Sequence, residues 1–345
     1  MLTRRGTLLA AAASGLPRIA IGQDLPVLQT LRSTARSWLW LAEDYGRDGG
    51  FFAKAGIKVV SNASNRGNNL AALSGSGPDI VLGDPGEVCN ARTQGLAVRS
   101  ILQMVEKYAT HVVLTQDAMK KTNVTLASPL SEKIAALRGL RLGTTGPAAS
   151  PDNLFRWLAV QGGMDPNRDI RLVPITGGGL GMMAAIQQGV IDGFALSSPT
   201  SDIAVLKFGC AYLIDMIGNP PQFLDRWCYI AATVSDRTLA AKRELLVRYA
   251  TGVALTLRSI RQDPERFKAF ALPFLELDPA IVDRAWQSNR GIYVETPVPD
   301  EALFRKLAEF VSIINKTQGI DPLPTTLAFT SVFDSSIAVE AVRNL

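Results

Sequence analysis

Residues 138–163 read RGLRLGTTGPAASPDNLFRWLAVQGG, and residues 168–215 read RDIRLVPITGGGLGMMAAIQQGVIDGFALSSPTSDIAVLKFGCAYLID. This stretch alternates short apolar runs rich in β-formers with amphipathic helical runs. Strands alternating with helices predict an α/β fold in which a mostly parallel sheet carries helices on both faces. The pattern predicts strands at 141–144, 170–175, 193–196 and 211–214, separated by helices at 151–161, 182–188 and 200–207.

The junctions between these elements carry the groups that we expect at a ligand site. Ser150 and Ser198 each precede a proline, so their hydroxyls are expected to cap the following helices. Gly177, Gly178 and Gly179 open the middle helix with unobstructed backbone N–H groups. In a doubly wound sheet such helix starts lie at the carboxyl ends of strands, where they favour an anionic group. Ordinary caps and turns without a ligand are the alternative interpretation.

Asp84 stands at the end of a strand predicted at 79–82 and has two interpretations. It precedes Pro85, and Glu87 follows three positions on, an arrangement similar to a helix capping box. Capping alone explains an aspartate there. If Asp84 faces the ligand instead, its carboxylate suits an amino or ring-nitrogen group, as in an aminosulfonate zwitterion.

The N-terminal segment is typical of an export signal. Thr3, Arg4 and Arg5 precede a short apolar run, the pattern of a twin-arginine signal, and the run is too short to span a bilayer permanently. We predict a signal at residues 1–22 and a periplasmic protein; a disordered start of a cytosolic protein is the alternative. Basic residues elsewhere are scattered without aromatic interleaving, so nucleic-acid binding is not indicated.

Known enzyme motifs fail in this chain. The glycine run at 177–181 resembles a nucleotide fingerprint, but Met182 replaces the last glycine and no Gly-Lys-Ser/Thr follows. His111, the only histidine, leaves no clustered ligand set for zinc or iron, and no Gly-x-Ser-x-Gly elbow is present. We therefore predict no cofactor, no metal and no catalytic activity, with a Cys89–His111 dyad as a remote alternative. Buried free thiols are expected, although one disulfide among Cys89, Cys210 and Cys228 remains open.

Three motifs in this order resemble the solute-binding proteins of ABC importers, in the branch that binds nitrate, sulfonates, taurine or thiamine-pyrimidine precursors. They are LRGLRLGTTGPAAS at 137–150, LVPITGGG at 172–179 and QQGVIDGFALSSP at 187–199. The first departs from the usual pattern because Leu142 replaces isoleucine or valine. The resemblance extends from about residue 25 to about residue 240.

This resemblance implies a two-lobed, type II periplasmic-binding-protein fold. Each lobe would be a mostly parallel sheet flanked by helices, and two crossing strands would join the lobes. We place lobe 1 at residues 23–110 and 231–345, lobe 2 at 111–230, and the crossings at the apolar runs 111–115 and 228–234. The helical tail would pack back on lobe 1.

The resemblance also implies that the lobes close on a ligand. The expected ligand-binding residues are Thr144, Thr145, Ser150, Gly178, Gly179 and Ser198 in lobe 2, with Ser33, Trp38, Gly83 and Asp84 in lobe 1. Trp38 either stacks on the ligand or lies on the buried face of its helix.

The implied function is capture of a small anionic organic solute by a monomeric exported protein, which delivers it to an ABC permease. Sulfonate, taurine, nitrate and a thiamine precursor all fit. The alternatives are an enzyme on the same fold, such as a pyrimidine-precursor synthase or a dehydratase, and an exported ligand sensor.

Overall fold

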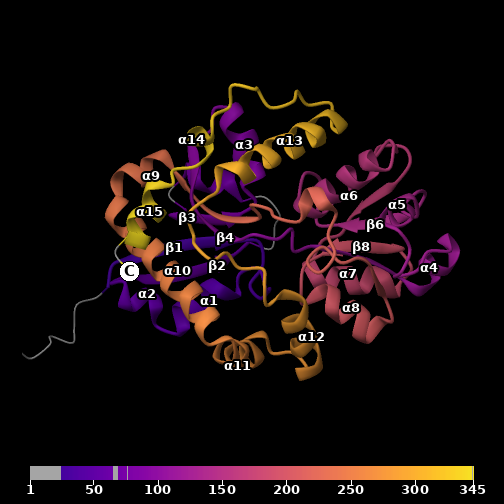
Figure 1. Ribbon diagram of the computed structural model, residues 1–345, viewed down its shortest axis with the longest axis horizontal. Coiled ribbons are helices and arrows are strands. Elements are labelled where there is room, and N and C mark those ends of the chain that lie inside the picture. Colours follow the sequence, from indigo (N-terminus) through magenta and orange to yellow (C-terminus); the bar gives the residue numbers. More distant parts are fainter. Residues whose placement is uncertain (1–24, 65–68, 76, 344) are drawn as a thin grey trace, which may run out of the picture.

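The computed structural model describes residues 25–64, 69–75, 77–343 and 345. The expected export signal lies outside these residues. The described chain forms two separate five-stranded sheets, and Figure 1 shows them side by side with helices around each. We call each sheet with its helices a lobe.

The first sheet has the strand order β2-β1-β3-β10-β4. β1 runs parallel to β2 and β3, whereas β10 is antiparallel to both of its neighbours. All six residues of β10 are buried, which fits an apolar strand near the centre of a sheet covered on both faces. The strands are β1 (Val27–Arg32), β2 (Lys58–Ala63), β3 (Ile80–Gly83), β4 (Val98–Val105) and β10 (Ile230–Ser235).

The second sheet has the order β7-β6-β8-β5-β9, with β6 parallel to β7 and β8, and β5 antiparallel to β8 and β9. Its strands are β5 (His111–Leu114), β6 (Arg141–Thr144), β7 (Arg171–Pro174), β8 (Gly193–Leu196) and β9 (Ala211–Ile214). Four of them are the strands that the alternating pattern predicts. The α/β class is therefore confirmed, and both sheets are mixed: in each, four strands run in one direction and one internal strand, β10 or β5, runs against them.

The helices fall into three groups along the chain. The first lobe contains α1 (Leu41–Asp48), α2 (Phe51–Lys54), η1 (Leu70–Ser74) and α3 (Pro85–Thr93). The second contains α4 (Gln116–Thr122), α5 (Leu130–Ala135), α6 (Ser150–Gln161), α7 (Gly178–Gln187) and α8 (Thr200–Phe208), and η2 (Gln222–Leu224) follows its last strand. The C-terminal group is α9 (Asp236–Ala241), α10 (Arg243–Gln262), α11 (Pro264–Leu275), α12 (Pro279–Asn289), α13 (Glu301–Thr317), α14 (Phe329–Val332) and α15 (Ser336–Arg343). None of the helices within the described ranges is long and apolar enough to cross a membrane.

The connections between the lobes lie next to the runs that the sequence assigned to them. β5 and β10 are internal strands of the two sheets, so the crossings are the segments before them, 106–110 and 215–229. The sequence could not make this distinction, because a strand buried on both faces has the same short apolar run that an extended, buried crossing would have. The two crossings run together, with Trp227 N donating to Glu106 O at 2.9 Å and Tyr229 N to Val105 O at 3.0 Å.

The C-terminal helices do more than cover the first lobe. α10 packs there against α1, α2 and α15, as the resemblance implies. In contrast, α12 packs on α8 and α13 packs on α6, both helices of the second lobe. Figure 1 shows α12 and α13 on opposite sides of the region where the two sheets face each other. The tail therefore braces both lobes.

Candidate functional site

The carboxyl ends of strands in both lobes face each other across the crossings. The first crossing joins the end of β4 to the start of β5, where His111 pairs with Leu196 at the end of β8. The second crossing ends where β10 begins, beside Gly83 at the end of β3. The loops after β1 and β3 therefore meet the loops after β6 and β8, the position at which ligands bind in open α/β sheets.

Asp84 connects the two lobes directly. Its side chain is 8% exposed; Oδ1 accepts a hydrogen bond from Gly86 N at 2.8 Å, and Oδ2 accepts one from Ser150 Oγ at 3.2 Å. Asp84 thus caps α3 and also reaches the second lobe, so the two interpretations of its role are not exclusive. The expected cap by Ser150 is wrong, because α6 has Ala149 at its N-cap position without a side-chain hydrogen bond.

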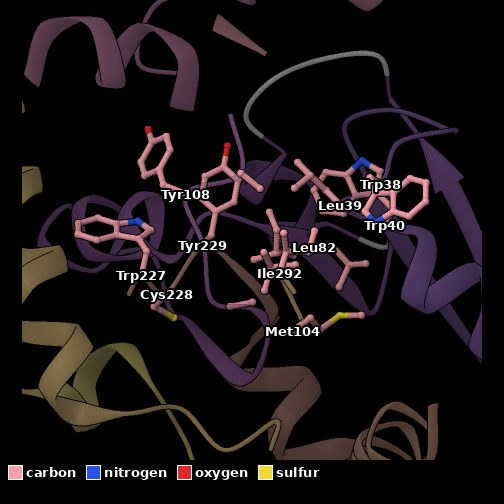
Figure 2. Packing of buried hydrophobic residues seen from close by; sticks show 14 of the residues in the cluster. Trp38, Leu39, Trp40, Leu82, Met104, Tyr108, Trp227, Cys228, Tyr229 and Ile292 are labelled. Atoms are coloured by element: carbon pink, nitrogen blue, oxygen red, sulfur yellow. The ribbon is translucent and has the colours of Figure 1, made fainter. Parts of the chain in front are cut away.

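Two tyrosines from the crossings complete this contact. The Tyr108 hydroxyl donates to Ser150 O at 2.6 Å, and the Tyr229 hydroxyl is hydrogen-bonded to Thr110 Oγ1. The two rings stack with centroids 4.7 Å apart, and Figure 2 shows both hydroxyls pointing the same way. Neither tyrosine was among the residues expected at the site; the available signal was an aromatic residue at or near the start of each of two apolar runs.

The electrostatics of this contact are dominated by carboxyl groups. Burial raises the pKa of Asp84 to about 6, against the hydrogen bonds from Gly86 and Ser150 that lower it. Burial, reinforced by the neighbouring Asp84 charge, also raises the pKa of Glu87, which is half-buried. No basic side chain contributes to either shift. Burying carboxylates without a counter-charge is costly.

A second contact joins the loop after β1 to the loop after β8. Trp38 N donates to Ser198 O at 3.1 Å, and Ser37 Oγ lies 3.3 Å from Ser197 Oγ and 3.2 Å from Ser198 O. Ser198 Oγ accepts a hydrogen bond from Asn289 Nδ2 of α12 at 2.6 Å. The expected cap by Ser198 is therefore also wrong, since α8 has no side-chain cap.

The Trp38 ring packs in the core behind this contact. It is fully buried, with centroid distances of 6.2 Å to Phe267 and 6.4 Å to Trp286. In Figure 2 the ring lies on the far side of Leu82 and Ile292 from the crossing tyrosines. The hydrogen bond from Trp38 to the second lobe comes from its backbone N–H.

The remaining predicted residues occupy three positions. Thr144, at the end of β6, is fully buried and its Oγ1 has no hydrogen-bond partner; Thr145 follows it, half-buried. Gly83 and Ser33 are half-buried at the ends of β3 and β1. Gly178 and Gly179 start α7 after the edge strand β7, and a Cβ at Gly179 would come within 2.4 Å of the Thr200 hydroxyl, so this glycine permits close packing of α7 on α8.

A surface cavity of about 550 Å³ lies elsewhere, between the start of α6 and the end of α13. Its lining includes Pro147, Arg156 and Gln318, and none of the predicted site residues. We therefore locate the candidate site by the contacts between the lobes.

Comparison with known proteins finds similarity in sequence to one family and in structure to several solved proteins. The model of the NMT1-like family matches residues 45–214, from α1 to the end of β9. This segment, just under half of the chain, is similar to the NMT1-like family. The resemblance to importer solute-binding proteins is confirmed by this match together with the structural similarities below. No curated protein sequence matches the chain.

The chain is similar in structure to several solved proteins. A protein from Bordetella bronchiseptica RB50 has a TM-score of 0.76 and 16% identity, covering 92% of this chain and 97% of its own. The alkanesulfonate-binding protein SsuA from Xanthomonas axonopodis pv. citri, bound to MOPS, has a TM-score of 0.66 and 16% identity, covering 93% and 99%. The periplasmic nitrate-binding protein NrtA from Synechocystis PCC 6803 has a TM-score of 0.69 and 15% identity, covering 93% and 89%. At identities this low, the structural similarity shows a shared fold, the periplasmic-binding-protein fold, and nothing finer.

The histidine and the cysteines are buried in the packing of the protein. His111 is buried, stacks on Tyr212 with centroids 4.5 Å apart, and has Nδ1 at 3.2 Å from Asp215 Oδ1. Cys89, Cys210 and Cys228 are buried and free. Within the described part of the chain, no group of three or more His, Cys, Asp or Glu side chains is arranged to hold a metal ion.

Proposed function

We propose that this protein is an exported solute-binding protein that captures a small organic solute between its lobes and delivers it to an ABC permease. The lobes would be residues 23–110 with 231–345, and residues 111–230. The observation that carries the proposal is the direct contact of the two strand-end edges, through Asp84–Ser150 and Trp38–Ser198. A solute held there would touch both lobes, so its binding would favour the closed arrangement.

The similarity to alkanesulfonate-binding and nitrate-binding proteins supports this role. A catalytic role on the same fold would need a reactive group at the interface. Burial raises the pKa of the Cys89 thiol, which disfavours the thiolate that nucleophilic catalysis requires. Hydrogen bonds contribute about 1 kcal/mol net each, so several of them together with apolar burial are enough for micromolar affinity at roughly −8 kcal/mol.

A thermal-shift screen of the mature protein tests the proposal. Taurine, alkanesulfonates, nitrate and pyrimidine amines would be added singly, and a ligand of the folded form raises the melting temperature by mass action. Replacing Thr145 with tryptophan should abolish the ligand-induced shift while leaving the melting temperature of the empty protein nearly unchanged. Thr326→Trp, at an exposed position between α13 and α14, is the matched control and should keep the shift.

Equal loss of binding and of empty-protein stability in Thr145→Trp would show that Thr145 is structural. Conversion of any member of the screen into a product would instead favour the enzymatic alternative.

A further inference from the structure

The charge at the interface between the lobes is negative and unbalanced. Asp84 and Glu87 lie within the first turn of α3, and both have pKa values raised by burial without the influence of any basic side chain. The basic side chains on the elements that form this contact pair with other carboxylates: Arg92 of α3 with Asp236, Lys107 of the first crossing with Asp225, and Arg156 of α6 with Asp152.

The start of α6, where the sequence predicts the anionic group of a ligand, already has an anionic neighbour. Ser150, the first residue of α6, donates its hydroxyl to Asp84 Oδ2, while Asp84 Oδ1 caps the start of α3. The Asp84 carboxylate thus lies between the N-termini of α3 and α6. The positive ends of the two helix dipoles favour an anion at this position. A ligand anion in that place would lie against Asp84 and Glu87, and like charges that close disfavour each other.

The other polar groups along this edge do not supply positive charge. The Tyr108 and Tyr229 hydroxyls are neutral and hydrogen-bonded to Ser150 O and Thr110. Thr144, at the end of β6 on the same edge of the second sheet, is fully buried with an unpartnered Oγ1. This hydroxyl is neutral as well, and it is free to hydrogen-bond a polar group.

We propose that the solute carries a protonated amine at the end that enters this contact, and that the Asp84 and Glu87 carboxylates accept its hydrogen bonds. This inference rests on the proposed function. An ammonium group would provide the counter-charge that the two carboxylates lack, and hydrogen bonds between charged partners are about twice as strong as neutral ones. Taurine satisfies this requirement, whereas nitrate and simple alkanesulfonates do not.

Matched ligands test the inference by titration calorimetry of the mature wild-type protein at pH 7.5. The set is 2-aminoethanesulfonate, its hydroxyl counterpart 2-hydroxyethanesulfonate, its N-acetyl derivative and nitrate, together with a second series built on 3-aminopropanesulfonate and a third on aminomethylpyrimidine. In each series the free amine should bind at least about tenfold more tightly than its hydroxyl or acetylated counterpart, the ratio expected from one charge-assisted hydrogen bond.

Binding of nitrate, a hydroxyl compound or an acetylated compound as tightly as the matching amine would overturn this inference and leave the proposed function standing. Absence of binding by every member of the three series would overturn both. The two failures are therefore distinguishable in one experiment.

Variants assign the effect to the two carboxyl groups. Glu87→Gln and Asp84→Asn should each weaken amine binding at least about tenfold, because each removes a negative charge that faces the ammonium group. Glu309→Gln removes a carboxylate from an exposed position of α13 and should leave the affinity unchanged. Unchanged amine affinity in both site variants, with melting temperatures showing that they fold, would overturn the assignment.

Discussion

At the scale of single residues, Asp84 shows how far local rules extend. The sequence placed it correctly at the end of a strand, before a proline, because capping depends on neighbours in the chain. Its second hydrogen bond, to Ser150, depends on the approach of a distant segment, which no local pattern encodes. The same reason explains why the hydroxyls of Ser150 and Ser198 leave their own helices uncapped and bond to Asp84 and Asn289, and why Tyr108 was missed.

Asp84 should make the stability of the empty protein depend on pH. Its pKa is about 6 in the folded chain against 3.8 for an unperturbed aspartate, so the folded state retains the proton that the unfolded state loses. Stability from this group is complete below about pH 4 and is lost as the pH rises through about 6, a change of up to about 3 kcal/mol. Asp84→Asn removes the titration, while Glu87, Tyr108 and Tyr229 remain around the site.

Urea unfolding at pH 4.5 and pH 8 measures this difference. The variant should gain stability relative to the wild type on going from pH 4.5 to pH 8. An equal pH dependence in the two proteins would show that Asp84 keeps an ordinary pKa.

At the scale of elements, the loop after β1 owes its position to a buried ion pair. Arg32, the last residue of β1, is 4% exposed, and its Nη2 donates to Asp44 Oδ1 and to Ala35 O, both at 2.8 Å. This guanidinium joins α1 to the loop that carries Ser37 and Trp38 to the second lobe. A lysine lacks the planar fork that makes both bonds and would leave the Asp44 carboxylate poorly paired.

Arg32→Lys should therefore destabilise the protein by about 2 kcal/mol, within the range for an unsatisfied buried polar group. Arg47→Lys is the matched control, because Arg47 Nη1 also lies 3.0 Å from Asp44 Oδ1 but its side chain is partly exposed, and it should cost less than about 1 kcal/mol. Urea unfolding gives both values; equal losses would show that Asp44 does not depend on the buried partner.

Most elements were predictable because their apolar periods are strong, and the exceptions have physical causes. The apolar period over residues 239–261 predicts a single helix, but the structure has a break at Lys242, between α9 and α10. No residue of α9 is buried, so the buried apolar face belongs to α10. The two crossings were placed too late in the chain. β5 and β10 are fully buried, and their apolar runs were taken for the crossings themselves.

At the scale of the whole molecule, the two lobes are held together by a few polar contacts and by the bracing helices α12 and α13. Sequence motifs predicted two lobes through a family resemblance, but the role of the tail in touching both was not visible, because helix packing partners are set by the completed fold. Two of these contacts use an asparagine amide. Asn289 Nδ2 on α12 donates to Ser198 Oγ at 2.6 Å, and Asn167 Nδ2 in the second lobe donates to Thr317 O of α13 at 2.7 Å.

These two contacts should differ in their effect on closure. Asn289 is fully buried, so its replacement by alanine leaves the Ser198 hydroxyl without that donor, at a cost of about 1–3 kcal/mol. Asn167 is exposed, and water replaces its bond to Thr317. Small-angle X-ray scattering of the ligand-free mature protein should therefore show a larger radius of gyration for Asn289→Ala and an unchanged one for Asn167→Ala. Because a more open resting state lowers the fraction competent to hold solute, Asn289→Ala should also weaken solute binding. If Asn289→Ala has the wild-type radius of gyration, the lobes are held closed by apolar packing of α12 and α13, and the polar contacts at the strand ends only define the register in which they meet.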